Sequence, residues 1–192
     1  MRTLSRGRRW TLAALVTALL GLAVLATAMA TGQAYRTDGP LVRESVIHID
    51  FPLRHGEVGT WGVSLPANPT LSEIVIESVE PVGVKALDLM GVAVITPGPR
   101  GGIGTAYGFP PEDFVPRPPE GAVLPAAGGG YLDVIIGVAR ADPSADGTID
   151  AVRLRYQHNG ARYELMIRES LRVFDPSSDG GTSHGHGSEP PA

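Results

Sequence analysis

Residues 149–174 read IDAVRLRYQHNGARYELMIRESLRVF, and they contain the clearest structural signal in the chain. Within them, Asn159-Gly160 is a preferred two-residue loop for a β-hairpin, because both loop residues must take positive φ. Strand-like alternation of apolar and polar residues lies on both sides of this dipeptide. The segment therefore predicts a hairpin with a defined register.

The register follows from the length of the loop, which sets His158 opposite Ala161. One face then receives apolar pairs throughout: Tyr156 with Tyr163, Leu154 with Leu165, and Val152 with Ile167. The other face receives polar pairs: Gln157 with Arg162, and Arg155 with Glu164, a cross-strand pair of opposite charge. A shift of one residue would set apolar side chains against charged ones. We therefore expect the apolar face to lie in the core and the charged face to meet water.

The composition limits the class of protein. A chain of 192 residues that is 43% hydrophobic and 19% charged is long enough for one domain with a sizeable core. The formal net charge of −4 gives no basic surface for nucleic acid, so a nucleic-acid partner is not expected. The chain has no cysteine, which excludes disulfides, thiolate metal sites and thiol nucleophiles. Its 25 glycines and 17 prolines are typical of a β-protein with many turns.

The N-terminal part of the sequence predicts a membrane anchor. A basic segment at residues 1–9 precedes an uncharged apolar run at residues 10–30, and about 20 apolar residues is the length of a membrane span. The sequence Ala28-Met29-Ala30 also fits the rule for signal-peptidase cleavage, so the alternative is a secreted domain that begins at Thr31. In both cases the basic segment stays cytoplasmic and the C-terminal domain lies outside the cell membrane.

Residues 31–40 are polar and predict a short tether, and alternating runs at residues 41–174 predict one β-domain. Strands are expected at five places before the hairpin: residues 42–51, 58–65, 72–82, 84–95 and 131–140. Residues 97–130 contain too many prolines and glycines for a long element, so they predict a functional loop with a short strand near residues 122–124. Residues 175–192 have no apolar pattern and predict a disordered tail.

Two of the expected strands make specific predictions. In residues 58–65, alternation places Trp61, Val63 and Leu65 in the core, and it turns Thr60, Gly62 and Ser64 toward solvent. In residues 84–95, Gly91 predicts a bulge, and Met90 is expected in the core.

Short strands, turn-rich connections and the absence of a second helical pattern predict an all-β fold. The specific expectation is an antiparallel immunoglobulin-like β-sandwich of about seven strands, preceded by one N-terminal hydrophobic helix, with a small barrel as the alternative. The basic start, the apolar run, the Trp61-Gly62-Val63 strand and the Asn159-Gly160 hairpin carry a resemblance in layout. In this layout the chain resembles bacterial membrane-anchored proteins with a single extracytoplasmic immunoglobulin-like β-sandwich of unassigned function. The resemblance carries no catalytic residue across.

Five residues are candidate metal ligands: His48, Asp50, His55, His184 and His186. Imidazole and carboxylate groups suit a divalent metal, and the first two of these residues point to the same side of the first strand. His184-Gly185-His186 lies in the expected disordered tail, where ordering entropy opposes tight binding. The alternative interpretation is that all five side chains are solvated, and no cofactor is predicted.

The Pro-rich loop contains four candidate partner-binding residues: Tyr107, Phe109, Phe114 and Val115. Prolines lower the cost of ordering a loop, and aromatic rings supply contact area, so these residues could form a docking surface. The alternative is that the rings fold under the loop and close one end of the core.

The chain contains no Gly-x-Ser-x-Gly elbow and no glycine-rich nucleotide loop followed by a helix, so enzymatic activity is not expected. The sequence favours a non-enzymatic binding module, tethered to the membrane and directed outward, whose partner is a membrane or envelope protein. The alternative is an accessory protein of the cell envelope that handles copper, nickel or zinc.

The anchor makes a direct prediction. If residues 10–30 span the membrane, the protein will fractionate with membranes and resist extraction by alkaline carbonate, because insertion of about 20 apolar residues is effectively irreversible. Fractionation followed by N-terminal sequencing measures this. A mature protein that starts at Thr31 would show that the segment is a cleaved signal peptide.

Overall fold

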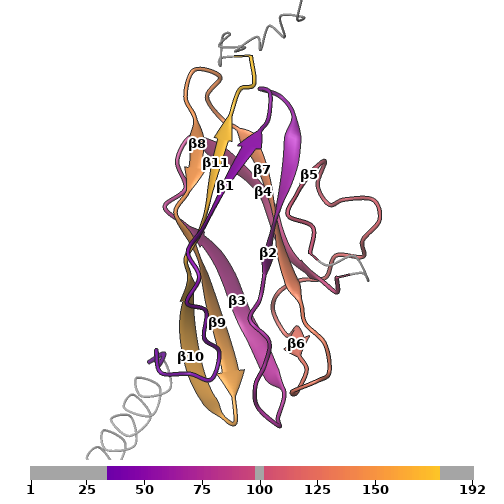
Figure 1. Ribbon diagram of the computed structural model, residues 1–192, viewed down its shortest axis with the longest axis vertical. Helices are drawn as coiled ribbons and strands as arrows, with labels where there is room; N and C mark the ends of the chain where they lie inside the picture. The colour runs from indigo at the N-terminus through magenta and orange to yellow at the C-terminus, as the bar shows by residue number, and fades with distance from the viewer. Residues whose placement is uncertain (1–33, 98–101, 178–192) are drawn as a thin grey trace, which may run out of the picture. The chain divides into compact units, whose positions relative to one another are not determined.

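The structure is a computed structural model that describes residues 34–97 and 102–177 (Figure 1). These residues form an all-β structure with eleven strands and no helix, which confirms the all-β part of the predicted fold. The expected anchor at residues 10–30 and nearly all of the expected tail lie outside the described residues. Within the described ranges, no helix has the length and apolar character that a membrane span requires.

The strands form three sheets. The first is antiparallel and has the order β4 (Leu87–Ile95), β7 (Asp133–Arg140), β2 (Val58–Ser64), β5 (Thr105–Tyr107). The second is also antiparallel, with the order β10 (Ala161–Ile167), β9 (Ala151–His158), β3 (Ile74–Val82), β6 (Val123–Leu124). The third has the order β1 (Ile47–Pro52), β11 (Glu169–Phe174), β8 (Gly147–Ile149), and in it β1 runs parallel to β11.

One long hairpin passes through the second and third sheets (Figure 1). Only Asp150 separates β8 from β9, and only Arg168 separates β10 from β11. These two interruptions, together with β5 and β6 inside the Pro-rich loop, explain why eleven strands are found where about seven were expected. The short strand expected near residues 122–124 is confirmed as β6.

The predicted register of the hairpin is confirmed. His158 pairs with Ala161, Tyr156 with Tyr163, and Arg155 with Glu164. Asn159 and Gly160 have φ angles of 49° and 76°, as a type I′ turn requires. On the outer face, Arg155 Nε donates to Glu164 Oε2 at 3.0 Å. On the inner face, the two tyrosine rings stack with their centroids 5.4 Å apart.

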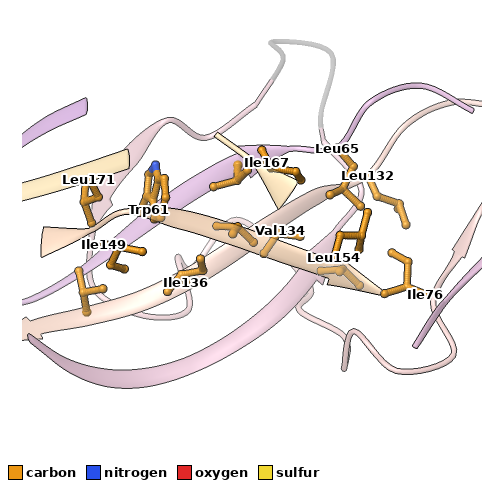
Figure 2. Packing of buried hydrophobic residues seen from close by; sticks show 14 of the residues in the cluster. Trp61, Leu65, Ile76, Leu132, Val134, Ile136, Ile149, Leu154, Ile167 and Leu171 are labelled. Atoms are coloured by element: carbon orange, nitrogen blue, oxygen red, sulfur yellow. The ribbon is translucent and has the colours of Figure 1, made fainter. Parts of the chain in front are cut away.

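One apolar core draws residues from all three sheets (Figure 2). Figure 2 shows Trp61 of β2 close to Ile149 of β8 and Leu171 of β11, with Ile136 of β7 nearby. Trp61 and Val63 are fully buried and Leu65 is nearly so, as the alternation predicted. The hairpin therefore presents its apolar face to the sheet that contains β2 and β7.

Two predictions about single residues are wrong. Thr60 was expected to face solvent, but it is fully buried and its Oγ1 donates to the carbonyl oxygen of Gly108, because the loop after β5 covers this face. Met90 was expected in the core, but it is 51% exposed. The pairing of β4 with β7 shifts between Leu89 and Gly91, so the expected bulge is present and displaces Met90 from the inner face.

The two faces of the hairpin predict different costs of mutation. Tyr156→Ala will lower the free energy of unfolding by about 3 to 5 kcal/mol, because the ring is 1% exposed and its loss leaves a cavity. Arg155→Ala will change it by less than about 1 kcal/mol, because the pair with Glu164 is partly exposed. Chemical unfolding measures both values, and similar losses for the two variants would contradict the assignment of the faces.

Candidate interaction surface at the edge of β4

The loop between β4 and β7 covers the outer face of the first sheet. Ile103, Phe109 and Phe114 from the loop pack against Ala93 and Ile95 of β4 and against Ile135 of β7. This second apolar cluster explains why β7 is buried along nearly its whole length on both faces. The first sheet is therefore covered by the main core on one side and by the loop on the other.

Phe109 fits against the sheet because two glycines lie beneath it. A Cβ atom on Gly137 of β7 would lie 2.4 Å from Phe109 Cγ, and one on Gly91 of β4 would lie 2.9 Å from Phe109 Cε1. Both distances are shorter than a carbon–carbon contact allows. Glycine at these two positions therefore creates a slot for the ring and fixes the loop above β4 and β7.

The structure separates the four residues that the sequence grouped as a docking surface. Phe109 and Phe114 are half-buried under the loop in the second apolar cluster, which is separate from the main core whose end the alternative interpretation expected them to close. Tyr107, on β5, is 65% exposed, and its ring lies 5.7 Å from that of Phe51. Val115 is 82% exposed. Because β4 and β5 are opposite edges of one sheet, Tyr107 and the β4 side of the loop do not form one surface.

Two hollows adjoin the edge of β4. The first, of about 330 Å³, lies between β4 residues 91–93 and the loop, where it is lined by Phe109 and by four prolines: Pro110, Pro116, Pro118 and Pro119. The second, of about 360 Å³, is lined by Thr96, Asp113, Phe114, Val115 and Arg117. Arg117 also lines the first hollow, so the two adjoin each other. Together they are named the β4-edge groove.

Arg117 attaches the loop to β4. Its backbone N–H donates to the Val94 carbonyl at 2.9 Å, and the Val94 N–H donates to the Arg117 carbonyl at 2.8 Å. Its guanidinium group also donates to Thr96 Oγ1 at 3.2 Å. The next two residues are Pro118 and Pro119, which have no N–H, so the pairing stops there.

Exposed apolar side chains accompany the groove. Val115 lines the groove and is 82% exposed, and Met90, which directly precedes the lining residue Gly91, is 51% exposed. Large apolar side chains that gather beside a hollow are typical of a site that binds another molecule. The β4-edge groove is therefore the candidate interaction surface.

Three of the five predicted metal ligands lie in the part of the chain that the structure describes, and it brings two of these three together. His48 Nε2 lies 3.5 Å from Asp50 Oδ1 on β1, while His48 Nδ1 lies 2.8 Å from Ser170 Oγ. His55 lies in the turn after β1, and the described residues contain no group of three His, Cys, Asp or Glu side chains that could hold a metal ion. His184 and His186 lie outside the described residues.

A buried charged cluster, which the sequence reasoning missed, lies where β2 ends and β7 begins. Arg43 forms an ion pair with Glu169, which is 4% exposed, and Arg43 also donates to the Ser64 carbonyl. Asp133 pairs with Ser64 in the sheet and is fully buried. Asp133 was detectable in the sequence as the one charged residue between Leu132 and Val138.

Burial raises the pKa of Asp133 above its usual value. The Ser64 hydroxyl, the Ile103 backbone N–H and the Arg43 charge lower this pKa by less than burial raises it. Neither carboxylate oxygen of Asp133 has a hydrogen-bond partner of ordinary geometry among the described residues, which is consistent with burial as the larger effect.

Comparison with known proteins assigns no family to the chain. No protein-family model matches it, and no curated protein matches its sequence.

The raised pKa predicts how stability changes with pH. As the pH rises from the unfolded pKa, about 3.9, through the higher folded value, Asp133 ionises more readily in the unfolded chain, so the folded state loses stability. Asp133→Asn removes this loss, so the variant will gain stability relative to the parent as the pH rises to neutrality. A series of chemical unfolding curves from acid to neutral pH measures the difference.

Asp142→Asn is a matched control for which the expected change of stability with pH is the opposite. The hydroxyl and backbone N–H of Ser144 donate to Asp142 Oδ1 at 2.7 and 2.8 Å and lower the pKa of that carboxyl group. Ionised Asp142 stabilises the folded state above the unfolded pKa, and this stabilisation disappears as the pH falls. Asp142→Asn removes it, so this variant will lose stability relative to the parent as the pH rises toward neutrality. The same pH trend in both variants would contradict the assigned role of burial at Asp133.

Proposed function

We propose that the protein is a non-enzymatic binding module, tethered to the outer face of the cell membrane by residues 10–30, that binds a membrane or envelope protein through the β4-edge groove. The single observation that carries the proposal is the groove itself, with its proline and phenylalanine walls and exposed apolar rim. Clefts with mostly apolar walls and a few polar groups are the usual binding sites of proteins.

The proposal includes an immunoglobulin-like β-sandwich as the scaffold. Its support is the strand order: β4-β7-β2 matches one sheet of that architecture, and β3 next to the long hairpin matches the other. Residues from these sheets meet in one core. On such a scaffold, loops and sheet edges are the usual places for recognition.

The groove is held in shape by the protein before a partner arrives. Phe109 is fixed in the slot formed by Gly91 and Gly137, and Arg117 is hydrogen-bonded to Val94. Loop residues between these two attachments are therefore confined at both ends. A surface ordered in advance loses less entropy on binding, which favours affinity.

The predicted metal-handling role receives less support from the described residues. Asp50 Oδ1 lies 3.8 Å from the guanidinium of Arg172, whose positive charge opposes a cation bound at His48 and Asp50. The observations around β1 therefore favour an ion-paired surface over a metal site.

Charged substitutions on the rim of the groove test the proposal. Met90→Lys and Val115→Lys place an ammonium group at exposed positions, so the fold will tolerate them, but each will reduce capture of the native partner by about tenfold or more because that charge must be desolvated on binding. Capture is measured by cross-linking the full-length protein in its native membrane and identifying the linked protein.

Leu71→Lys is the matched control. Leu71 is 95% exposed in the turn before β3, so the same change of chemistry there will leave capture unaltered. If the rim variants capture the partner as well as the parent does, or if Leu71→Lys abolishes capture equally, the β4-edge groove is not the binding surface.

A further inference from the structure

β4 is an edge strand, and part of its edge has no neighbouring strand within the described residues. Antiparallel pairs alternate between those that exchange hydrogen bonds and those that do not. Val94 directs its N–H and C=O outward to Arg117, so Val92, two residues earlier, directs its own N–H and C=O to the same edge. In the described part of the chain, no loop segment bonds to these two groups of Val92.

An extended polypeptide is the chemical class that satisfies both backbone groups at once. In strand addition, main-chain hydrogen bonds supply affinity and pockets beside the edge supply specificity. Side chains of a strand alternate between its two faces, so a strand beside Val92 would direct some of them to the outer face. There they would enter the hollow of about 330 Å³ beside Phe109 and the loop prolines.

The charged residues near the groove indicate which charge a bound segment carries. Asp113 lines the groove, Glu112 precedes it in the loop, and Asp88 lies on β4 three residues before the lining residue Gly91. All three are exposed, and within the described residues none of the three carboxylates forms an ion pair. Among the described residues that line the groove, Arg117 is the one cation, and it is hydrogen-bonded to Thr96. The excess of negative charge favours basic residues in a partner and opposes an anionic lipid surface.

We propose that the groove binds an extended segment of a partner polypeptide in which apolar and basic residues alternate, and that this segment adds to the sheet as a strand beside β4 residues 88–93. The inference rests on the proposed function of the groove and specifies the chemistry of its occupant. Arg117 closes one end of the free edge, and the bulge at Met90 bends the other end. The added strand is therefore short.

Hydrogen–deuterium exchange of the full-length protein in lipid nanodiscs tests the proposal. The probe is a synthetic peptide in which lysine alternates with valine, and the matched control is the peptide in which glutamate replaces lysine. At a free peptide concentration about ten times Kd, the lysine peptide will slow exchange of the Val92 amide by about tenfold. The glutamate peptide will produce no protection, and added salt will weaken binding of the lysine peptide.

Val92→Pro tests the backbone contact directly. This substitution removes the N–H that points to the free edge and leaves the ladder between β4 and β7 intact, and proline is tolerated at such edge positions. The variant will lose protection along β4 while β7 stays as protected as in the parent, which shows that the fold is retained. Leu71→Lys will bind the lysine peptide as the parent does.

Several outcomes would overturn the proposal. Equal protection by both peptides would remove the charge preference, and protection of the loop at residues 109–119 without β4 would exclude strand addition. Protection of β4 that grows with protein concentration in the absence of peptide would assign the edge to a second copy of the chain. Absence of protection, combined with partner capture that still depends on Met90 and Val115, would reject strand addition while retaining the proposed function.

Discussion

The pairing within the long hairpin is the constraint on which the other elements depend. Its type I′ turn fixes the register, and the register decides which side chains of β9 and β10 face the core. β3 pairs along β9 and β1 pairs along β11, so strands distant in the sequence take their positions from this hairpin. β2 and β7 then cover its apolar face with Trp61 and Ile136. A slip at the turn would expose apolar side chains in every one of these contacts.

The features that the sequence predicted correctly are local ones. Alternation over a few residues and a specific turn dipeptide determined the hairpin, the burial of Trp61 and the bulge at Gly91. The failures depend on segments far apart in the chain. Thr60 is buried because a loop almost 50 residues later folds over it. The alternation of residues within β2 cannot indicate a contact with so distant a segment. The sequence grouped Tyr107 with the other aromatic residues of the loop, but Tyr107 lies at the opposite edge of the sheet from β4 because β5 pairs with β2.

Covering both faces of the first sheet has an electrostatic cost. Arg43, Glu169 and Asp133 are removed from water beside the loop, and the ion pair between the first two offsets part of the desolvation of each. The Asp133 carboxylate has no equivalent hydrogen bond among the described residues, so its burial favours the neutral acid. The loop is thus stabilised by the apolar contacts of Phe109 and Phe114, and the charged cluster reduces that stabilisation at its margin.

The residues that attach the loop to the sheet are different from the exposed residues between them that are available for recognition. Phe109 is held by glycines of the sheet and Arg117 by the backbone of Val94, so residues 111–116 contribute little to either attachment apart from the contact of Phe114. Exposed positions in this interval can therefore diverge in evolution without loss of the scaffold. Natural variants, or grafted sequences of similar length, could acquire different recognition properties on an unchanged framework, much as interchangeable loops diversify other β-proteins.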